Sequence, residues 1–305
     1  MRIAFLGTPD FTLPILEACA RRGSLVLVVA QPDKPVGRHA ELKAPPSKVW
    51  AREHGVRVEQ PAKVKNGALA AVLASAQADV AVVAAYGRIL PADALETPRL
   101  GCLNVHASLL PELRGAAPAQ WAVARQYRES GVTIMQMDEG LDTGDIRLQR
   151  RLELAPDETG ESLLARLGPL GALALTEALS LLERGALPRT PQDDALATHA
   201  PLLSREDGRI DWKMSAQELD ARRRGFTPWP GVWTTVHGAV LKIHEARPVA
   251  ASGAPGELLE GAVVACGAGT GWQLVDVQPE GRKRMPAAAW LSGARLPAKF
   301  RLGTD

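Results

Sequence analysis

Residues 79–87 read DVAVVAAYG, an almost unbroken apolar run that ends at a glycine. A run of this length without polar alternation is typical of a strand that is buried on both faces of a parallel sheet. Similar runs occupy residues 2–7 (RIAFLG) and 24–30 (SLVLVVA), and helical patterns lie between the runs. This alternation predicts βαβ units and hence an α/β fold, a Rossmann-like and mostly parallel sheet with helices on both faces.

The pattern changes after residues 187–206, where the sequence LPRTPQDDALATHAPLLSRE is rich in proline, threonine and aspartate. We expect this segment to be a linker. Beyond it, residues 232–244 (VWTTVHGAVLKIH) resemble two alternating strands joined at a His-Gly turn, and residues 272–278 resemble another strand. Short strands at this spacing predict a smaller β-barrel (OB-like) domain. The expected domains are therefore residues 1–186 and 207–305.

Residues 31–48 (QPDKPVGRHAELKAPPSK) interrupt the first domain with four prolines and several basic side chains. A segment of this length without periodicity inside a compact domain is usually functional or disordered, and a solvated loop is the plain alternative. The net charge of the chain is only +2. Any contact with nucleic acid would therefore depend on local basic clusters such as this one.

Several classes of site and location are disfavoured by the sequence. The first apolar run ends in GTPDF (residues 7–11), so the dinucleotide fingerprint and the P-loop are both missing. The three cysteines, Cys19, Cys102 and Cys266, lie far apart, which argues against a metal site and for a reducing cytoplasm. No apolar run reaches the roughly 20 residues that a membrane-spanning helix needs, and the start of the chain does not resemble a signal peptide.

Residues 101–115 (GCLNVHASLLPELRG) place two hydrogen-bonding side chains at the end of another predicted strand. Asn104 and His106 are two residues apart, so their side chains share one face of that strand. In doubly wound sheets, ligands gather at the carboxyl ends of the strands. A candidate site is therefore expected here, although a polar strand end without a function is the plain alternative.

An acidic glycine loop follows the strand predicted at the start of residues 131–146 (GVTIMQMDEGLDTGDI). Its carboxylates are Asp138, Asp142 and Asp145. If one of them reached His106, it would fix the tautomer of the ring and favour an imidazolium, which together with the Asn104 amide could stabilise an oxyanion. Ser108 has no G-x-S-x-G motif around it, so direct acyl transfer to a nucleophile on the substrate is the simpler interpretation. The aspartate spacing does not match an EF-hand calcium loop.

These motifs carry a resemblance to a known family. NVHASLLPELRG (104–115) followed by MDEGLDTGDI (137–146) resembles the folate-dependent formyltransferases. The resemblance covers nearly the whole chain, through the motifs MRIAFLGTPDF, QPDKPVGR, GAAPAQ, GVTIMQMD, RIDW, PWPG and VQPEGRKRM. The segment 31–48 and the C-terminal domain are similar to those of members that act on methionyl-tRNA.

The resemblance implies an enzyme that transfers the formyl group of the co-substrate 10-formyltetrahydrofolate to the α-amine of methionyl initiator tRNA, for translation initiation. Asn104, His106 and Asp142 match the catalytic set of the family, and only the resemblance selects Asp142 among the three aspartates. By the same resemblance, Asn104 and His106 stabilise the oxyanion formed by direct amine attack. Asp142 then orients His106 and helps to move a proton toward N10 of the folate through water. No metal is implied.

Two binding surfaces are also implied by the resemblance. The folate-binding residues would be Ser108, Leu109, Leu110 and Pro111, together with Tyr86, Gly87 and Leu90. The tRNA-binding residues would be Arg38, Lys43, and the two clusters Arg222, Arg223, Arg224 and Arg282, Lys283, Arg284. A solvated face without a partner is the plain alternative for each cluster. Glu112, Thr227 and His199 depart from the residues expected in the family, and none of them belongs to the catalytic set.

Three other functions remain open from the sequence. One is a formyltransferase that acts on a nucleotide or amino-sugar amine, and the second is a hydrolase of formyl-folate. The third is a non-catalytic RNA-binding protein, which would not need an amide, an imidazole and an acidic loop together. We expect a monomer, because one chain holds both implied binding surfaces.

Overall fold

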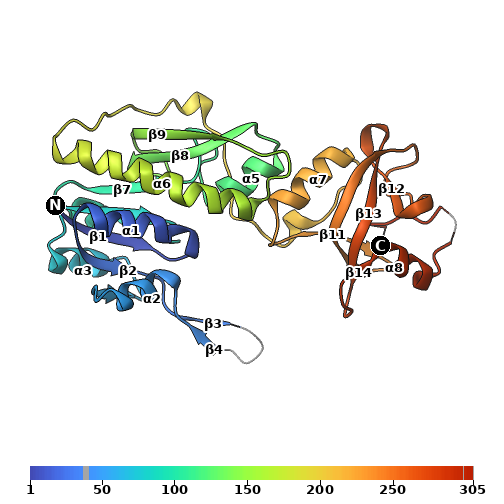
Figure 1. Cartoon of the computed structure of the whole chain (residues 1–305), viewed down its shortest axis with the longest axis horizontal. Helices are drawn as coiled ribbons and strands as arrows, with labels where there is room; N and C mark the ends of the chain where they lie inside the picture. Colours follow the sequence, from blue (N-terminus) through green and yellow to red (C-terminus); the bar gives the residue numbers. More distant parts are fainter. Residues whose placement is uncertain (37–40, 298, 305) are drawn as a thin grey trace. The chain divides into compact units, whose positions relative to one another are not determined.

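The computed structural model describes residues 1–36, 41–297 and 299–304, and Figure 1 shows the course of the chain. The chain forms two compact units. The first unit comprises Met1–Pro118, Glu129–Glu153 and Leu163–Pro201. The second comprises Ala119–Arg128, Leu154–Ser162 and Leu202–Asp305. The second unit thus takes in two short segments from the middle of the chain, and the domain boundaries expected at residues 186 and 207 stay a prediction.

The first unit is built on a mixed sheet, whose described strands run in the order β5–β2–β1–β6–β7–β8–β9. The strands are β1 (Arg2–Gly7), β2 (Ser24–Val29), β5 (Val58–Glu59), β6 (Val80–Ala84), β7 (Cys102–His106), β8 (Glu129–Gln136) and β9 (Ile146–Glu153). The pairings from β5 through to β7 are parallel, while β8 is antiparallel to both β7 and β9. The mostly parallel sheet expected from the apolar runs is therefore confirmed.

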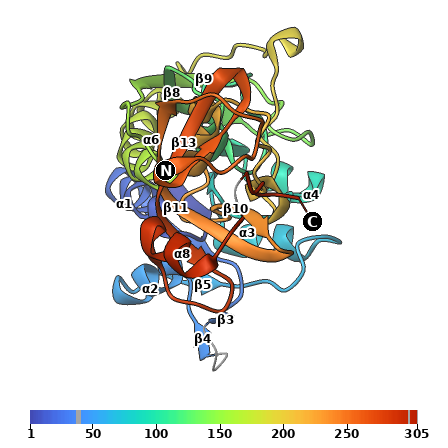
Figure 2. The same cartoon turned by 90° about the vertical axis from the view of Figure 1, so that its right-hand side faces the viewer.

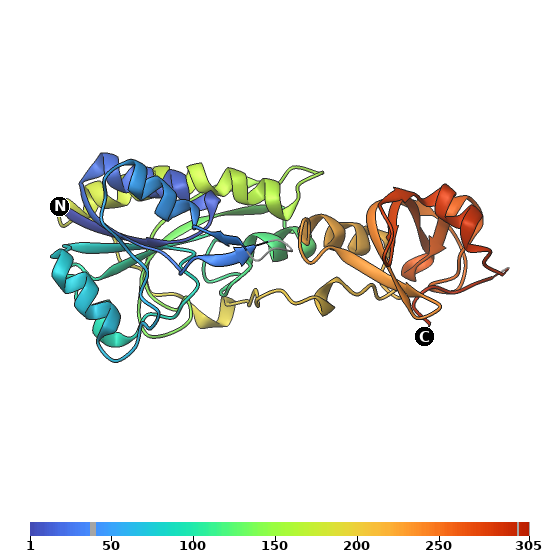
Figure 3. The same ribbon diagram turned by 90° about the horizontal axis from the view of Figure 1, so that it is seen from below.

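Helices cover both faces of this sheet, as Figure 3 shows with α1 and α6 on one side and α3 on the other. The helices of the first unit are α1 (Leu13–Arg22), α2 (Pro46–Glu53), α3 (Ala68–Ala76), α4 (Ala92–Glu96) and most of α6 (Gly160–Glu183). Helix α5 (Pro118–Ala124) belongs to the second unit except for its first residue. Leu6 of β1 packs in one cluster with Leu69 and Leu73 of α3. Its neighbour Phe5 is also fully buried and faces the opposite side, because successive side chains of a strand alternate. Both faces are thus apolar, which explains the unbroken runs.

The helix α6 has the length and composition of a membrane-spanning helix. It is the one such helix among the described residues, and the sequence interpretation did not single it out. Within the first unit it lies against the sheet, where a Cβ on Gly171 would come within 3.0 Å of Val105 of β7. Leu167 and Leu175 are 2% and 0% exposed, so one face of α6 is that of a core helix, while Leu173 on the same helix is exposed.

The segment expected to be irregular forms a short hairpin where the structure describes it. Strands β3 (Lys34–Val36) and β4 (Glu41–Lys43) pair antiparallel. Residues 37–40, and with them the expected tRNA contact Arg38, lie outside the described residues. At the base of the hairpin, Lys48 Nζ donates to both carboxylate oxygens of Asp33 at 2.7 Å, and Gln60 donates to one of them at 2.8 Å. The hairpin is therefore anchored by an ion pair whose lysine is only 8% exposed.

The second unit contains an antiparallel sheet, which confirms the predicted change of fold class after the linker. Its described strands run in the order β10–β11–β13–β12, with β14 paired to β13, and Figure 2 shows β11 and β13 side by side. The elements are β10 (Val232–Val236), β11 (Ala239–Ala250), β12 (Val263–Ala265), β13 (Thr270–Pro279), β14 (Met285–Pro286), α7 (Ala216–Gly225) and α8 (Ala287–Ala294). His237 and Gly238 both have positive φ, as the predicted two-residue turn requires.

Short 3₁₀ helices complete the described structure. They are η1 (Asp10–Thr12), η2 (Asp194–Leu196), η3 (Glu206–Gly208), η4 (Glu260–Ala262) and η5 (Gly267–Gly269). In the second unit, Trp121 of α5 packs edge-to-face on Phe226 with ring centroids 5.2 Å apart. A Cβ on Gly225 would lie 2.7 Å from the Ala124 nitrogen, so α5 and α7 touch at a position of α7 that has no room for a side chain.

The Asp33–Lys48 pair makes a testable contribution to stability. Hydrogen bonds from Lys48 and Gln60 lower the pKa of Asp33 below its ordinary value. Because that pKa is lower in the folded chain, the pairing stabilises the fold above the ordinary aspartate pKa of about 3.9 and is lost as pH falls through the folded-state value. We expect Asp33→Asn to unfold at lower urea concentration than the wild type at neutral pH, with a difference that shrinks below about pH 4. Urea unfolding at several pH values measures this, with Glu41→Gln on the same hairpin as control. A pH-independent difference would contradict it.

Candidate active site

Two polar side chains stand at the carboxyl end of β7, near the middle of the sheet. Asn104 lies opposite Val83 of β6, and His106 lies opposite Thr133 of β8. Asn104 is half-buried, and His106 is only 5% exposed. The two side chains are thus fixed by strands on either side, and both reach the same neighbouring loop.

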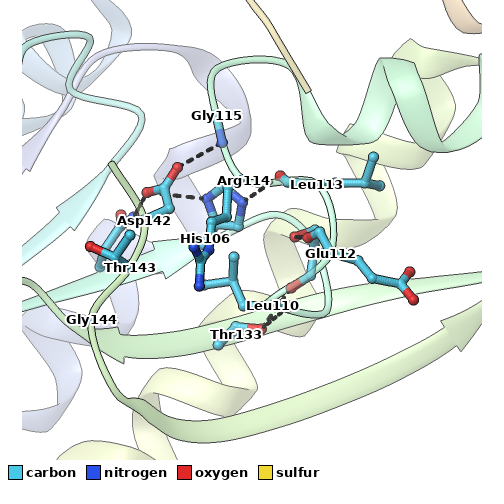
Figure 4. Close-up of polar contacts among 12 residues, drawn as sticks. His106, Leu110, Glu112, Leu113, Arg114, Gly115, Thr133, Asp142, Thr143 and Gly144 are labelled. Atoms are coloured by element: carbon cyan, nitrogen blue, oxygen red, sulfur yellow. Dashed lines mark hydrogen bonds and ion pairs between the residues drawn. The ribbon is translucent and has the colours of Figure 1, made fainter. Parts of the chain in front are cut away.

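That loop connects β8 to β9 and carries Asp142, which Figure 4 shows facing His106. Asp142 Oδ1 lies 3.7 Å from His106 Nδ1 and 3.4 Å from Asn104 Nδ2. The other oxygen, Oδ2, accepts a hydrogen bond of 2.8 Å from the Gly115 amide. The amide and the imidazole therefore converge on one point, and in this structure that point is a carboxylate oxygen of the chain itself.

The hydrogen-bond partner of the second ring nitrogen of His106, Nε2, determines the tautomer of the neutral ring. Nε2 lies 3.1 Å from the carbonyl oxygen of Leu113. Since a carbonyl only accepts hydrogen bonds, Nε2 carries a hydrogen. Nδ1 therefore faces Asp142 as an acceptor when the ring is neutral and as a donor when the ring is protonated. The ring can exchange a proton at Nδ1 without turning.

The other two candidate aspartates are bonded elsewhere. Asp138 accepts hydrogen bonds from the Gly140 amide at 3.0 Å and from the Thr143 hydroxyl at 2.7 Å. Asp145 forms an ion pair with Arg189. Of the three carboxylates, that of Asp142 faces His106, while its catalytic role stays a prediction.

The side chain of Thr133, on β8, holds the turn from Ser108 to Pro111 through hydrogen bonds. The Thr133 hydroxyl donates to the Ser108 carbonyl at 2.7 Å and accepts from the Leu110 amide at 3.0 Å. Gln149 donates to both the Thr133 hydroxyl and the Leu110 carbonyl, at 3.0 and 2.8 Å. The side chains of Ser108 and Leu110 are buried, so their contact with folate, which stays a prediction, would be made by the backbone. Leu109 and Pro111 are half-buried.

The expected folate-binding residues after β6 differ in how exposed they are. Tyr86 and Leu90 are each 2% exposed and pack in the apolar cluster beneath the sheet. Burial raises the pKa of the Tyr86 phenol, although Arg88 acts in the opposite sense. The Tyr86 carbonyl accepts a hydrogen bond from Gln31 at 2.9 Å. Gly87, the next residue, is exposed and has a φ of +76°, so this segment presents backbone rather than aromatic surface.

The two basic clusters of the second unit differ in how free their charges are. Arg223 and Arg224 are each 19% exposed and both form ion pairs with Asp220, three and four residues earlier on α7. Arg222 is half-buried over the ring of Phe226. In the second cluster Arg282, Lys283 and Arg284 are exposed, and Arg284 pairs with Asp276. The RNA contact expected of the first cluster thus has to compete with internal pairing.

The metal-ligating residue types are scattered. Among the residues that the structure describes, no group of three or more His, Cys, Asp or Glu side chains could hold a metal ion. The three cysteines are buried and free. Burial raises the pKa of the Cys102 and Cys266 thiols to about 12, so neither is a poised nucleophile.

Two side chains that the sequence interpretation did not single out contact the candidate site. Thr133 was visible only as a polar residue in an apolar strand. Gln192 lies in the predicted linker, yet its Nε2 donates to the Asp142 carbonyl at 2.8 Å and to the Gly144 carbonyl at 2.7 Å. A glutamine among prolines and aspartates has no local signal for such a role, because its partners are some 50 residues away in the chain.

Comparison with known proteins decides the family. Residues 1–179 match the sequence profile of the formyl transferase family, and residues 202–295 match that of the formyl transferase C-terminal domain. The methionyl-tRNA formyltransferase of Anaeromyxobacter dehalogenans is 55% identical over 313 residues, which cover 100% of both chains. The chain belongs to the methionyl-tRNA formyltransferase family.

Further relatives agree with this assignment. The methionyl-tRNA formyltransferase of Geobacter metallireducens is 46% identical, with 99% of each chain covered. Among solved structures, HypX from Aquifex aeolicus in complex with tetrahydrofolic acid superposes with a TM-score of 0.63 at 19% identity, over 100% of this chain and 51% of that one. At that identity the likeness shows the fold alone. The resemblance predicted from the motifs is confirmed, and the family is a folate-dependent one.

The role of Thr133 under the Ser108–Pro111 turn can be measured. We expect Thr133→Val to lower the free energy of unfolding by about 2 kcal/mol, because buried partners of the lost hydroxyl remain unsatisfied. The Michaelis constant for the folate co-substrate should rise as the turn loosens. A matched control is Thr235→Val, since the buried Thr235 hydroxyl has no hydrogen-bond partner among the described residues. Equal effects of the two substitutions on unfolding would show that Thr133 does not hold the turn.

Proposed function

We propose that this protein transfers the formyl group of 10-formyltetrahydrofolate to the α-amine of methionyl initiator tRNA, so that the charged tRNA can start translation in the cytoplasm. The observation that carries the proposal is 55% identity to a methionyl-tRNA formyltransferase over the entire length of both chains. We further propose that the chain acts as a monomer, since it supplies both the candidate active site and the basic segments.

The proposed oxyanion site consists of Asn104 and His106. Both donors approach Asp142 Oδ1, within 3.4 and 3.7 Å, so an oxygen bound beside that carboxylate would face both of them. The amide has a second hydrogen to offer, and a protonated His106 offers Nδ1–H. Donors placed in advance at the position of a developing oxyanion typically contribute several kcal/mol to lowering the barrier, about 3 to 4 for a single donor.

The proton route uses Asp142 and His106. Attack of the methionyl amine on the formyl carbon forms a C–N bond and turns the formyl oxygen into an oxyanion. The amine must lose a proton, and N10 of the folate must gain one before the bond from N10 to carbon breaks. Asp142 Oδ1 and His106 Nδ1 are adjacent groups that can accept and return that proton, directly or through water. The products are formyl-methionyl-tRNA and tetrahydrofolate.

The hairpin supports an anionic partner such as tRNA. Lys34 and Lys43 lie directly opposite each other on β3 and β4, and both are exposed. Like charges at such a cross-strand position destabilise a hairpin. A phosphate placed between the two ammonium groups would remove this repulsion, and Arg38 lies on the same segment of the sequence. In the second unit the exposed residues Arg282 and Lys283 offer further charge.

The reaction itself is tested with purified protein, 10-formyltetrahydrofolate and methionine-charged initiator tRNA. We expect formyl-methionyl-tRNA to form, and His106→Ala to reduce the rate by at least about 100-fold, because an oxyanion donor is lost. Binding of the charged tRNA should be retained, and the exposed His54→Ala serves as control. Unchanged transfer in His106→Ala would refute the mechanism. Transfer to a glycinamide nucleotide or amino sugar instead of tRNA, or formate release without acceptor, would refute the function.

The hairpin lysines predict a salt effect. We expect Lys34→Ala and Lys43→Ala to raise the Michaelis constant for charged tRNA and leave that for the folate unchanged. Each substitution should also reduce the salt dependence of tRNA binding, by about 1 in the slope of log K against log salt for each phosphate that the lysine neutralised. Arg21→Ala is the control, because Arg21 is an exposed arginine in the last turn of α1. A slope that does not change in either lysine variant would argue against phosphate contacts at the hairpin.

A further inference from the structure

We infer that Gln192 is a positioning residue for the transfer reaction, and that it acts by holding the backbone of Asp142 in the conformation that presents its carboxylate to His106 and Asn104. The inference rests on the proposed function. It assigns part of the catalytic apparatus to the segment 187–206, which the sequence suggested was only a linker.

The backbone of Asp142 is in a conformation that needs support. Its φ is +56°, in the left-handed region that residues with a Cβ rarely adopt. A residue in this region persists only where its surroundings hold it. The loop is also tightly packed two residues further on, where a Cβ on Gly144 would lie 1.8 Å from the Gln136 carbonyl oxygen. The loop is therefore narrow and strained at the residue whose carboxylate faces the imidazole.

Gln192 supplies that support through both hydrogens of its amide. Nε2 donates to the Asp142 carbonyl at 2.8 Å and to the Gly144 carbonyl at 2.7 Å. One amide group thus joins two carbonyls of the loop, at Asp142 and two residues after it. Together with the 2.8 Å bond from the Gly115 amide to Oδ2, it fixes Asp142 at its backbone and at its side chain.

Arg114 fixes the orientation of the Gln192 amide. Its Nε and Nη2 donate to Gln192 Oε1 at 3.0 and 2.8 Å. A guanidinium has no acceptor, so the amide oxygen must face Arg114 and the amide nitrogen must face the loop. Arg114 is only 5% exposed, and its Nη2 also pairs with Asp194, whose side chain is 84% exposed. Every polar atom of the Gln192 side chain is thus used in one orientation.

Backbone hydrogen bonds hold the segment that carries Gln192 to the rest of the first unit, both before and after this residue. Thr190 and Ile146 exchange two backbone hydrogen bonds of 2.9 Å. Further along, the Arg114 amide donates to the Thr198 carbonyl at 2.8 Å, and the Ala200 amide donates to the Arg114 carbonyl at 2.7 Å. Gln192 is therefore a side chain on an anchored segment, which makes it a rigid support.

Loss of the two amide hydrogens should let Asp142 leave its left-handed conformation and move its carboxylate relative to His106. Misplacement of a catalytic group by about 1 Å can cost 100-fold in rate. The binding surfaces proposed for folate and tRNA do not include Gln192, so the loss should appear in kcat and not in either Michaelis constant.

The most informative variant is Gln192→Glu. A glutamate keeps both bonds to Arg114, now charge-assisted, but has no hydrogen to donate to the two carbonyls. We expect kcat to fall between about 10- and 100-fold, with both Michaelis constants within about twofold of wild type. Thermal stability should fall as well, because the two carbonyl oxygens lose their donor and face a carboxylate oxygen. Gln192→Met, which also removes the hydrogen bonds from Arg114, should be at least as slow. Asp193→Asn is the matched control on the same segment and should stay within about twofold of wild type, since Asp193 is exposed and caps η2 by accepting from the Ala195 amide, which an asparagine oxygen can also do.

A structural readout separates this inference from the proposed function. The Gly115 amide is protected by Asp142 Oδ2, so hydrogen exchange at Gly115 and in residues 139–146 should accelerate in Gln192→Glu, whichever acceptor is formylated. Unchanged exchange would overturn the inference, even if the rate of transfer fell. If the wild type formylated no acceptor but exchange accelerated, the proposed function would fail and the support of Asp142 would stand.

A double-mutant comparison tests whether the effect passes through Asp142. Once the carboxylate is gone in Asp142→Asn, adding Gln192→Glu should reduce the residual rate by less than about twofold, because residues that act as a unit are not additive. A further fall in the double variant as large as that of Gln192→Glu alone would show a general structural role and overturn the inference.

Discussion

The hydrogen bond from the Gly115 amide to Asp142 Oδ2 joins the two halves of the candidate active site. One partner follows β7, which carries the amide and the imidazole, and the other lies in the loop between β8 and β9. Gly115 can make this bond only because it is a glycine. Its φ is +123°, and a Cβ would lie 2.6 Å from the Ala200 carbonyl oxygen. Three stretches of chain, around residues 115, 142 and 200, therefore meet at a position with no room for a side chain, and their relative placement sets the distances of the site.

Local patterns in the sequence were sufficient for the central strands of the sheet and for half of the site, but not for β5 and β9, which have no apolar run. The apolar runs of β1, β2 and β6 predicted parallel strands, because burial on both faces leaves no polar alternation. Asn104 and His106 were predicted to share a face by the period of a strand. The choice of Asp142 among three aspartates came from the resemblance to the family, since spacing alone does not say which carboxylate turns inward. The structure places Asp138 and Asp145 in other bonds.

The rest depended on long-range contacts that have no local pattern. Gln192 and Thr133 act through partners that are distant in sequence, and neither residue type is unusual in its surroundings. One signal was available and was not used: Asp220 precedes Arg223 and Arg224 by three and four residues, which on a helix predicts the ion pairs that the structure contains. That spacing indicates that the charges of those arginines are partly neutralised. The position of Lys34 opposite Lys43 on the β3–β4 hairpin, by contrast, becomes visible only once the strand register is known.

The composition of the second unit limits how this protein can be dissected. Residues 119–128 and 154–162 belong with the C-terminal unit, although they lie within the N-terminal half of the chain. A polypeptide that stopped in the segment 187–206 would keep Trp121 but lose Phe226, against which the indole packs, and would also lose α7 from beside Ala124. The truncated product would expose apolar surface that is normally covered and would tend to aggregate. Proteolytic removal or genetic deletion of the C-terminal unit is thus a poor way to isolate the catalytic one, and single-residue changes are the cleaner means of separating catalysis from RNA recognition.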